Sequence, residues 1–144
     1  KKLRLCGTVR TFEASTMDQI EGDMRTLVEG LPKLHGATGQ LDFRRGYPSV
    51  TNDPQAAALA ADVVLSHFGE ASLESDLTPT LGGEDFSFYL QEIPGAFIFL
   101  GNGNSKNAQH DGTHSLHSPF YDFNDSLLPV GVRFWSRLVT TYLK

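Results

Sequence analysis

Cysteine is nearly absent from this sequence, which has 144 residues and a single cysteine, Cys6. One cysteine cannot form a disulfide within the chain, and it excludes every zinc-finger spacing. We therefore expect Cys6 to be a small core residue on a strand. Because structural disulfides belong to oxidising compartments, a chain that cannot form one favours a reducing, cytoplasmic location.

Positive charge and long apolar runs are also scarce. Lys and Arg number 12 against 17 Asp and Glu, which gives a formal net charge of -5. No basic run offsets this charge, so a nucleic acid is not expected as a partner. The apolar runs are far shorter than the ~20 residues of a membrane-spanning helix, so no membrane partner is expected either. The sequence also lacks a phosphate-binding loop that ends in Lys-Ser/Thr and a G-x-S-x-G nucleophile elbow.

Apolar residues make up 40% of the chain and include ten Phe, enough for a core. Three segments carry strand patterns: residues 3–12, residues 40–44, and the apolar run at residues 96–100 between two glycines. Four helices are expected from caps and apolar spacing, beginning at Thr16, at Asp53, near Asp85, and at Asn124 or Asp125. This order of elements predicts an α/β chain in two unequal parts, both short of sheet partners.

His117 is the first candidate for chemistry. It lies in a loop stiffened by Ser118 and Pro119, and an imidazole held in this way suits a divalent metal. A nearby carboxylate such as Asp122 could orient the ring through its second nitrogen. Taken by itself, however, a lone histidine in a loop is more often polar surface.

The sequence HDGTHSLH around His117 offers a second arrangement. In it, His110 or His114 contributes to an independent metal site together with Asp111. The HxxxH spacing serves metal binding on a helix, and Gly112 disfavours a helix here. A solvated loop is the alternative interpretation.

Charged and glycine residues elsewhere suit the binding of a carboxylate. Glu84 and Asp85 can perform acid–base work or bind metal, or they can complement the positive end of the helix that follows, which we favour. Gly82 and Gly83 can bring backbone N–H groups close to a substrate carboxylate. Arg10 either binds a carboxylate through its guanidinium or is a surface arginine on a strand.

Five motifs follow one another along nearly the whole chain: GTVRTF, GYPSVTND, GGEDFSFY, FLGNG and LHSPFYDFND. Their order resembles the C-terminal portion of metal-dependent amidohydrolases and peptidases, the family of the aminoacylases, hippurate hydrolase and auxin-conjugate hydrolases. The resemblance implies that residues 1–48 form the last strand–helix–strand of a lid, or dimerisation, domain, which is an α/β sandwich. It implies that residues 51–144 form the C-terminal part of an αβα metallopeptidase domain.

The same resemblance implies roles for single residues. His117 matches the family's last metal ligand, and Arg10 matches the lid-domain arginine that binds the substrate carboxylate. Gly82 and Gly83 match a substrate-facing loop. Cys6 does not match the family's metal-binding cysteine, because no CGHD-like segment follows it. No catalytic residue is assigned, since the family's general base belongs to the N-terminal half.

By this resemblance, the complete enzyme hydrolyses the amide bond of N-acyl amino acids or short peptides with a divalent metal, Zn, Mn, Co or Ni. One histidine cannot hold a catalytic metal pair, so we expect the site to be incomplete and the chain to be inactive alone. The expected partners are the N-terminal half of the catalytic domain or a second subunit, with a homodimer also possible. Two alternatives stay open: a non-catalytic, homo-oligomerising interaction module on the same scaffold, and a small metal-binding protein built on HDGTHSLH.

Overall fold

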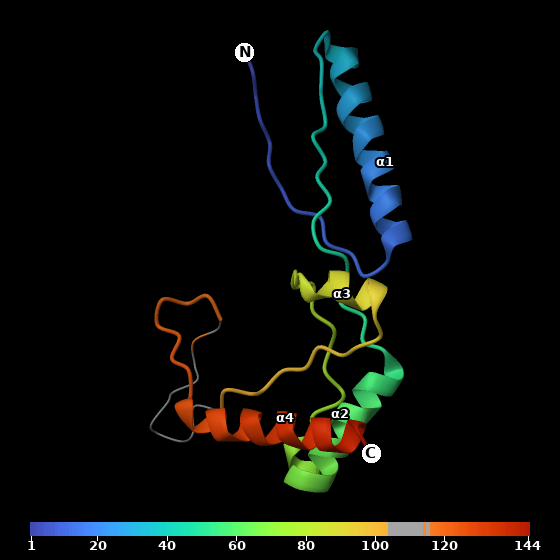
Figure 1. The fold of residues 1–144 in the computed structure, drawn as a ribbon. Coiled ribbons are helices and arrows are strands. Elements are labelled where there is room, and N and C mark those ends of the chain that lie inside the picture. Colours follow the sequence, from blue (N-terminus) through green and yellow to red (C-terminus); the bar gives the residue numbers. More distant parts are fainter. Residues whose placement is uncertain (104–113, 115) are drawn as a thin grey trace. The chain divides into compact units, whose positions relative to one another are not determined.

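The computed structural model describes residues 1–103, 114 and 116–144 (Figure 1). Within these ranges the regular elements are helices joined by irregular chain, and none of the described residues forms a strand. The α-helices are α1 (Ala14–Gly30), α2 (Pro54–Phe68), α3 (Phe86–Glu92) and α4 (Leu128–Tyr142). Short 3-10 turns are η1 (Leu31–His35), η2 (Glu70–Ser72) and η3 (Asp125–Leu127).

The chain divides into two compact units. Unit 1 consists of Lys1–Thr51 and Thr78–Pro94, and unit 2 consists of Asn52–Leu77 and Gly95–Lys144. Each unit is therefore assembled from two separate stretches of chain. The division into domains at residues 1–48 and 51–144 stays a prediction.

In unit 1, α1 carries the apolar face that its sequence predicts. Met17, Ile20, Met24 and Val28 lie at helical spacing and are half-buried, whereas Leu27, which was expected on the same face, is 54% exposed. The predicted start at Thr16 is wrong, because α1 begins at Ala14 without a side-chain cap. The amide of Met17 already donates a hydrogen bond to the carbonyl of Glu13 at 3.2 Å, so the first turn of α1 begins before Thr16.

Unit 2 is built on the packing of α2 against α4. The side chain of Asp53 accepts bonds from the amides of Gln55 and Ala56, which confirms it as the N-cap of α2. The buried apolar side chains of the described residues are Ala60 and Val63 of α2 and Phe134 of α4. Three such residues make a very small core.

The predicted α/β fold is wrong for the described part of the chain. Neither the α/β sandwich of a lid domain nor a portion of an αβα domain is present, because residues 3–12, 40–44 and 96–100 form no ladder. A strand requires a hydrogen-bonded neighbour, and alternating apolar residues indicate only a face that favours burial. At Phe97, both backbone groups bond the side chain of Asn52 instead, at 2.8 and 3.0 Å.

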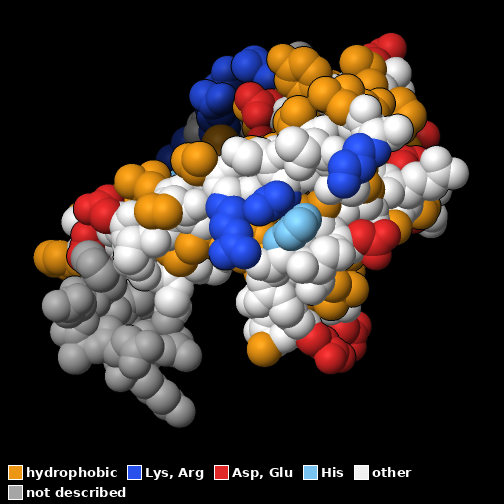
Figure 2. Space-filling model, turned by 60° about the horizontal axis from the view of Figure 1, so that its bottom comes forward, with side chains coloured by type: hydrophobic (Ala, Val, Ile, Leu, Met, Phe, Trp, Pro, Cys, Tyr) orange, Lys and Arg blue, Asp and Glu red, His pale blue; other side chains and the backbone are white. Residues whose placement is uncertain are grey.

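Many large apolar side chains remain exposed in consequence. Leu3 and Leu5, in the first predicted strand, are 83% and 86% exposed. Cys6, expected in the core, is exposed as well. Figure 2 shows several groups of hydrophobic side chains on one face of the molecule. Among the helices of the described ranges, none has the length and apolarity to cross a membrane.

Candidate functional site

Arg10 reaches the loop that contains the paired glycines. Its guanidinium Nη1 donates a hydrogen bond to the carbonyl of Leu81, the residue directly before Gly82. The two residues are 71 positions apart in the sequence, so the fold of unit 1 brings them together. Three predicted substrate-binding residues, Arg10, Gly82 and Gly83, therefore lie at one place. Their role in binding stays a prediction.

An aromatic side chain lies close to this loop. A β-carbon added to Gly83 would lie 3.4 Å from Cδ2 of Tyr47, at van der Waals contact. The ring of Tyr47 meets that of Phe88 edge to face, with centroids 5.9 Å apart. The glycine loop is thus contacted by Arg10 and lies close to one ring of an aromatic pair.

Glu84 acts as a helix cap rather than as an exposed acid. Its carboxylate Oε1 accepts a bond from the amide of Phe86 at 3.2 Å, at the start of α3. Its carbonyl accepts a bond from the hydroxyl of Ser87, which is fully buried. These contacts agree with the favoured interpretation of this acidic pair as a complement to the helix N-terminus. The side chain of Asp85 makes no cap bond.

His117 lies in unit 2 and adopts an unusual backbone conformation. It is exposed and has a φ of 70°, a left-handed value that few residues other than glycine adopt. The next residues close a turn, in which the carbonyl of Ser118 accepts from the amide of Tyr121 at 3.1 Å. A sparsely populated backbone conformation of this kind often occurs at functional sites.

Asn102 fixes the chain that follows this turn, and the sequence interpretation missed it. Its side-chain amide donates to the carbonyl of Asp122 and accepts from the amide of Asn124, both at 2.8 Å. Asn124 in turn caps η3 by accepting from the amide of Ser126. Asn102 lies in the motif FLGNG, where an amide side chain between two glycines was the available signal.

Of the other residues predicted to bind a metal, only His114 lies in the described part of the chain. The ring of His114 lies 5.5 Å from that of Phe120, centroid to centroid. His110 and Asp111 lie outside the described residues. Among the residues that the structure does describe, no three His, Cys, Asp or Glu side chains are close enough to hold a metal ion together.

The sequence is similar to a known family and to several bacterial proteins. The model of the peptidase family M20/M25/M40 matches residues 9–141. A Synechocystis protein named "Probable hydrolase sll0100" is 34% identical over 131 residues, 91% of this chain and 33% of the relative. A Bacillus subtilis protein named "Putative amidohydrolase YhaA" is 30% identical over 138 residues, 96% of this chain and 34% of the relative.

A third relative, "Uncharacterized hydrolase SAB1253" of Staphylococcus aureus, is 28% identical over 137 residues, 94% of this chain and 34% of the relative. The chain thus spans about a third of the length of the curated relatives that it matches. No solved structure matches the chain significantly.

Proposed function

Because the chain belongs to the peptidase family M20/M25/M40, we propose that it is part of a metal-dependent amidohydrolase. The reaction is hydrolysis of the amide bond of N-acyl amino acids or short peptides. The observation that carries this proposal is the contact of Arg10 with the carbonyl of Leu81, next to Gly82 and Gly83. It gathers the residues suited to a substrate carboxylate in a chain that matches a peptidase family over most of its length.

The carboxylate of the substrate's amino-acid part is the group that these residues bind. The guanidinium of Arg10 offers several donors in a planar fork, and one of them already bonds Leu81. The remaining donors are suited to bind a carboxylate in bidentate fashion. Gly82 and Gly83 have no side chains to keep a ligand from their backbone N–H groups.

His117 supplies one imidazole ligand to a divalent metal, Zn, Mn, Co or Ni. When bound, such a metal polarises the amide carbonyl and generates hydroxide from water. The left-handed backbone of His117 and the exposure of its side chain support this role. The remaining ligands and the general base belong to other parts of the complete protein, and no residue of this chain is assigned as catalytic. The free Cys6 thiol suits a cytoplasmic, reducing compartment.

Hydrolysis of hippurate tests this function. We expect no turnover by the pure chain, and turnover that depends on Mn²⁺ or Zn²⁺ when the chain is mixed with the part of YhaA outside its matching region. In that complex, Arg10→Ala raises KM about tenfold or more because a charge-assisted bond to the carboxylate is lost. Arg4→Ala, an exposed arginine in the same segment, is the control and leaves KM unchanged.

Two results count against the proposal. Metal-dependent turnover by the pure chain contradicts the shared site. A stable complex that has all its metal but no activity on hippurate, N-acetyl amino acids or dipeptides contradicts the reaction. Equal KM values for Arg10→Ala and Arg4→Ala contradict only the substrate-binding role of Arg10 and leave the proposed reaction standing.

The exposure of Leu3 and Leu5 favours a second candidate function. Such a segment suits a non-catalytic module that joins two copies of the chain. The solution mass separates the two functions. A stable dimer that binds neither metal nor N-acyl amino acids, with or without the YhaA part, favours the module.

A further inference from the structure

An apolar stripe runs along the outer side of α4. It consists of residues separated alternately by four and three positions: Leu128, Val132, Trp135, Val139 and Tyr142. All five are between 52% and 74% exposed. Residues at this spacing lie on one face of a helix, as in the seam between two packed helices. We call them the α4 stripe.

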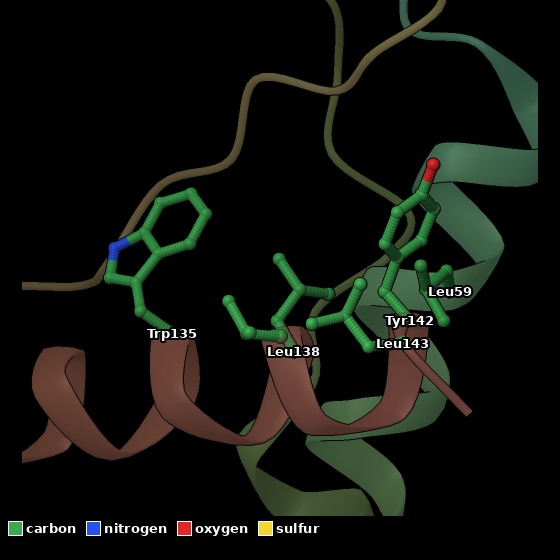
Figure 3. Close-up of a pocket in the computed structure, with 6 residues that line it drawn as sticks. Leu59, Trp135, Leu138, Tyr142 and Leu143 are labelled. Atoms are coloured by element: carbon green, nitrogen blue, oxygen red, sulfur yellow. The ribbon is translucent and has the colours of Figure 1, made fainter.

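The C-terminal half of the α4 stripe borders an open hollow. Its volume is about 290 Å³, and its lining comes from Leu59 of α2 together with residues at the end of the chain: Trp135, Leu138, Val139, Tyr142 and Leu143. Figure 3 shows Leu59 beside Tyr142 and Leu143, with Trp135 at the other end of the group. The lining is aliphatic and aromatic, so the hollow is suited to an apolar side chain from outside the unit.

The internal packing of unit 2 covers only part of this surface. The core of the α2–α4 pair consists of Ala60, Val63 and Phe134, and Leu138 packs against it. The ring of Trp135 meets that of Phe134 edge to face, yet every side chain of the α4 stripe stays more than half exposed. Contiguous apolar surface that a domain leaves uncovered is typical of an interaction site. The α4 stripe and its hollow are such a surface.

A second copy of the chain is a poor occupant. α4 has 15 residues, only about two heptads, whereas a coiled coil needs roughly three to four. Its sequence, LPVGVRFWSRLVTTY, contains no acidic residue. Two copies of α4 therefore lack the opposite charges that align helices beside such a seam.

The greater length of the curated relatives favours a different occupant for the α4 stripe. The chain spans about a third of its curated relatives, so roughly two thirds of such a protein lies outside the matching region. We infer that the α4 stripe is the surface on which this chain docks an apolar element of those complementary two thirds. The inference rests on the proposed function, because it identifies the face through which the shared active site is assembled.

Binding to the part of YhaA outside its matching region tests this inference. Trp135 is the single tryptophan of the chain, so 5-fluorotryptophan in the chain reports on the α4 stripe alone, even when the partner contains tryptophan. We expect a shifted fluorine resonance and loss of its solvent exposure on mixing. Val139→Asp weakens the affinity about tenfold or more, because docking would bury an unpaired charge.

Thr140→Asp is the matched control. Thr140 is exposed, neighbours Val139 in the last turn of α4, and lies off the stripe. Both substitutions add one negative charge in the last turn, one residue apart, so their effects on the helix dipole are similar. Thr140→Asp leaves the affinity unchanged. Val132→Asp, two turns earlier, repeats the test in case Val139→Asp lowers the helix content measured by circular dichroism.

The outcomes separate this inference from the proposed function. Binding that depends on the α4 stripe but gives no hydrolysis supports the docking surface and contradicts the activity. Hydrolysis with equal affinities for Val139→Asp, Val132→Asp and Thr140→Asp supports the activity and overturns the docking surface. Absence of binding, or a dimer of the chain that Val139→Asp dissociates, overturns it as well.

Discussion

At the scale of single residues, Asn102 is the side chain that the structure singles out near His117. One amide group holds the carbonyl of Asp122 and the amide of Asn124 at 2.8 Å each. An amide side chain that uses its donor and its acceptor on one backbone segment replaces a neighbouring strand. Asn52 does the same for Phe97 in another part of unit 2. The two asparagines are therefore a matched pair for experiment.

We expect Asn102→Ala to loosen the chain after His117. Hydrogen exchange at the amide of Asn124 should become at least about fivefold faster, because an intramolecular hydrogen bond contributes about 1 kcal/mol. Amide exchange measured by NMR checks this prediction. Asn52→Ala is the control, and it should speed exchange at Phe97 but not at Asn124. Equal exchange at Asn124 in Asn102→Ala and the unchanged chain would contradict the prediction.

The sequence could indicate some of these residues and not others. Asp53 is a cap that its own neighbours determine, since Pro54 follows it and the bonded amides are two and three residues away. Asn102 and Asn52 act on backbone 20 and 45 residues away, and no local pattern contains that information. The positive φ of His117 is likewise a property of the folded turn.

At the scale of elements, ion pairs join α1 to the segment that follows it. The guanidinium of Arg45 contacts the carboxylates of Asp18 and Glu21 at 2.6 and 2.7 Å. The hydrogen bond from Arg45 lowers the pKa of Glu21 below its ordinary value of 4.5, and Arg25 lowers it further. Arg44 lowers the pKa of Asp42 in the same way, within its own segment.

The lowered pKa of Glu21 determines how the stability of the fold changes with pH. Because folding lowers the pKa of Glu21, its contribution to stability is complete above pH 4.5 and is lost as the pH falls through the folded value. We expect α1 to lose its ion pair between Glu21 and Arg45 on acidification below pH 4.5, and the carboxylate of Glu21 to titrate at a higher pH in Arg45→Gln than in the unchanged chain. A carbon-13 NMR titration of the Glu21 carboxylate measures this shift.

Arg44→Gln is the control for the titration of Glu21. It should raise the pKa of Asp42 and leave that of Glu21 unchanged, because Arg44 contacts Asp42. Both pairs are solvent-exposed, so added salt should weaken both shifts. A pKa of Glu21 that is the same in Arg45→Gln and in the unchanged chain would contradict the assignment of the ion pair.

Helices and strands were predicted with different success, for a physical reason. Helices α2 and α3 begin at the indicated places because caps and spacing act within a few residues. Residues 96–100 form no strand, because a strand needs a hydrogen-bonded partner segment and local spacing cannot show whether one exists. The substrate residues were proposed through an ordered set of motifs, and the fold of unit 1 places Arg10 beside the glycine loop.

At the scale of the whole molecule, the described residues bury few apolar side chains for a chain of this length. Ala60, Val63 and Phe134 are the buried apolar ones in these ranges, and the α4 stripe remains exposed. Denaturant sensitivity scales with the surface that folding buries. We therefore expect the isolated chain to unfold in urea with an m-value below the ~1–3 kcal/mol/M of small proteins. It should also bind the dye ANS on its exposed apolar surface.

The complementary part of YhaA should change both properties together. Docking at the α4 stripe buries apolar surface, so the chain in the complex should unfold more steeply and bind less ANS. Urea titrations followed through 5-fluorotryptophan at Trp135 check this for the chain alone and in the complex. A partner that binds only the folded chain stabilises it by mass action, so the urea concentration at the midpoint of unfolding should rise with partner concentration. A steep transition and no ANS binding in the isolated chain would mean that it completes its core without a partner.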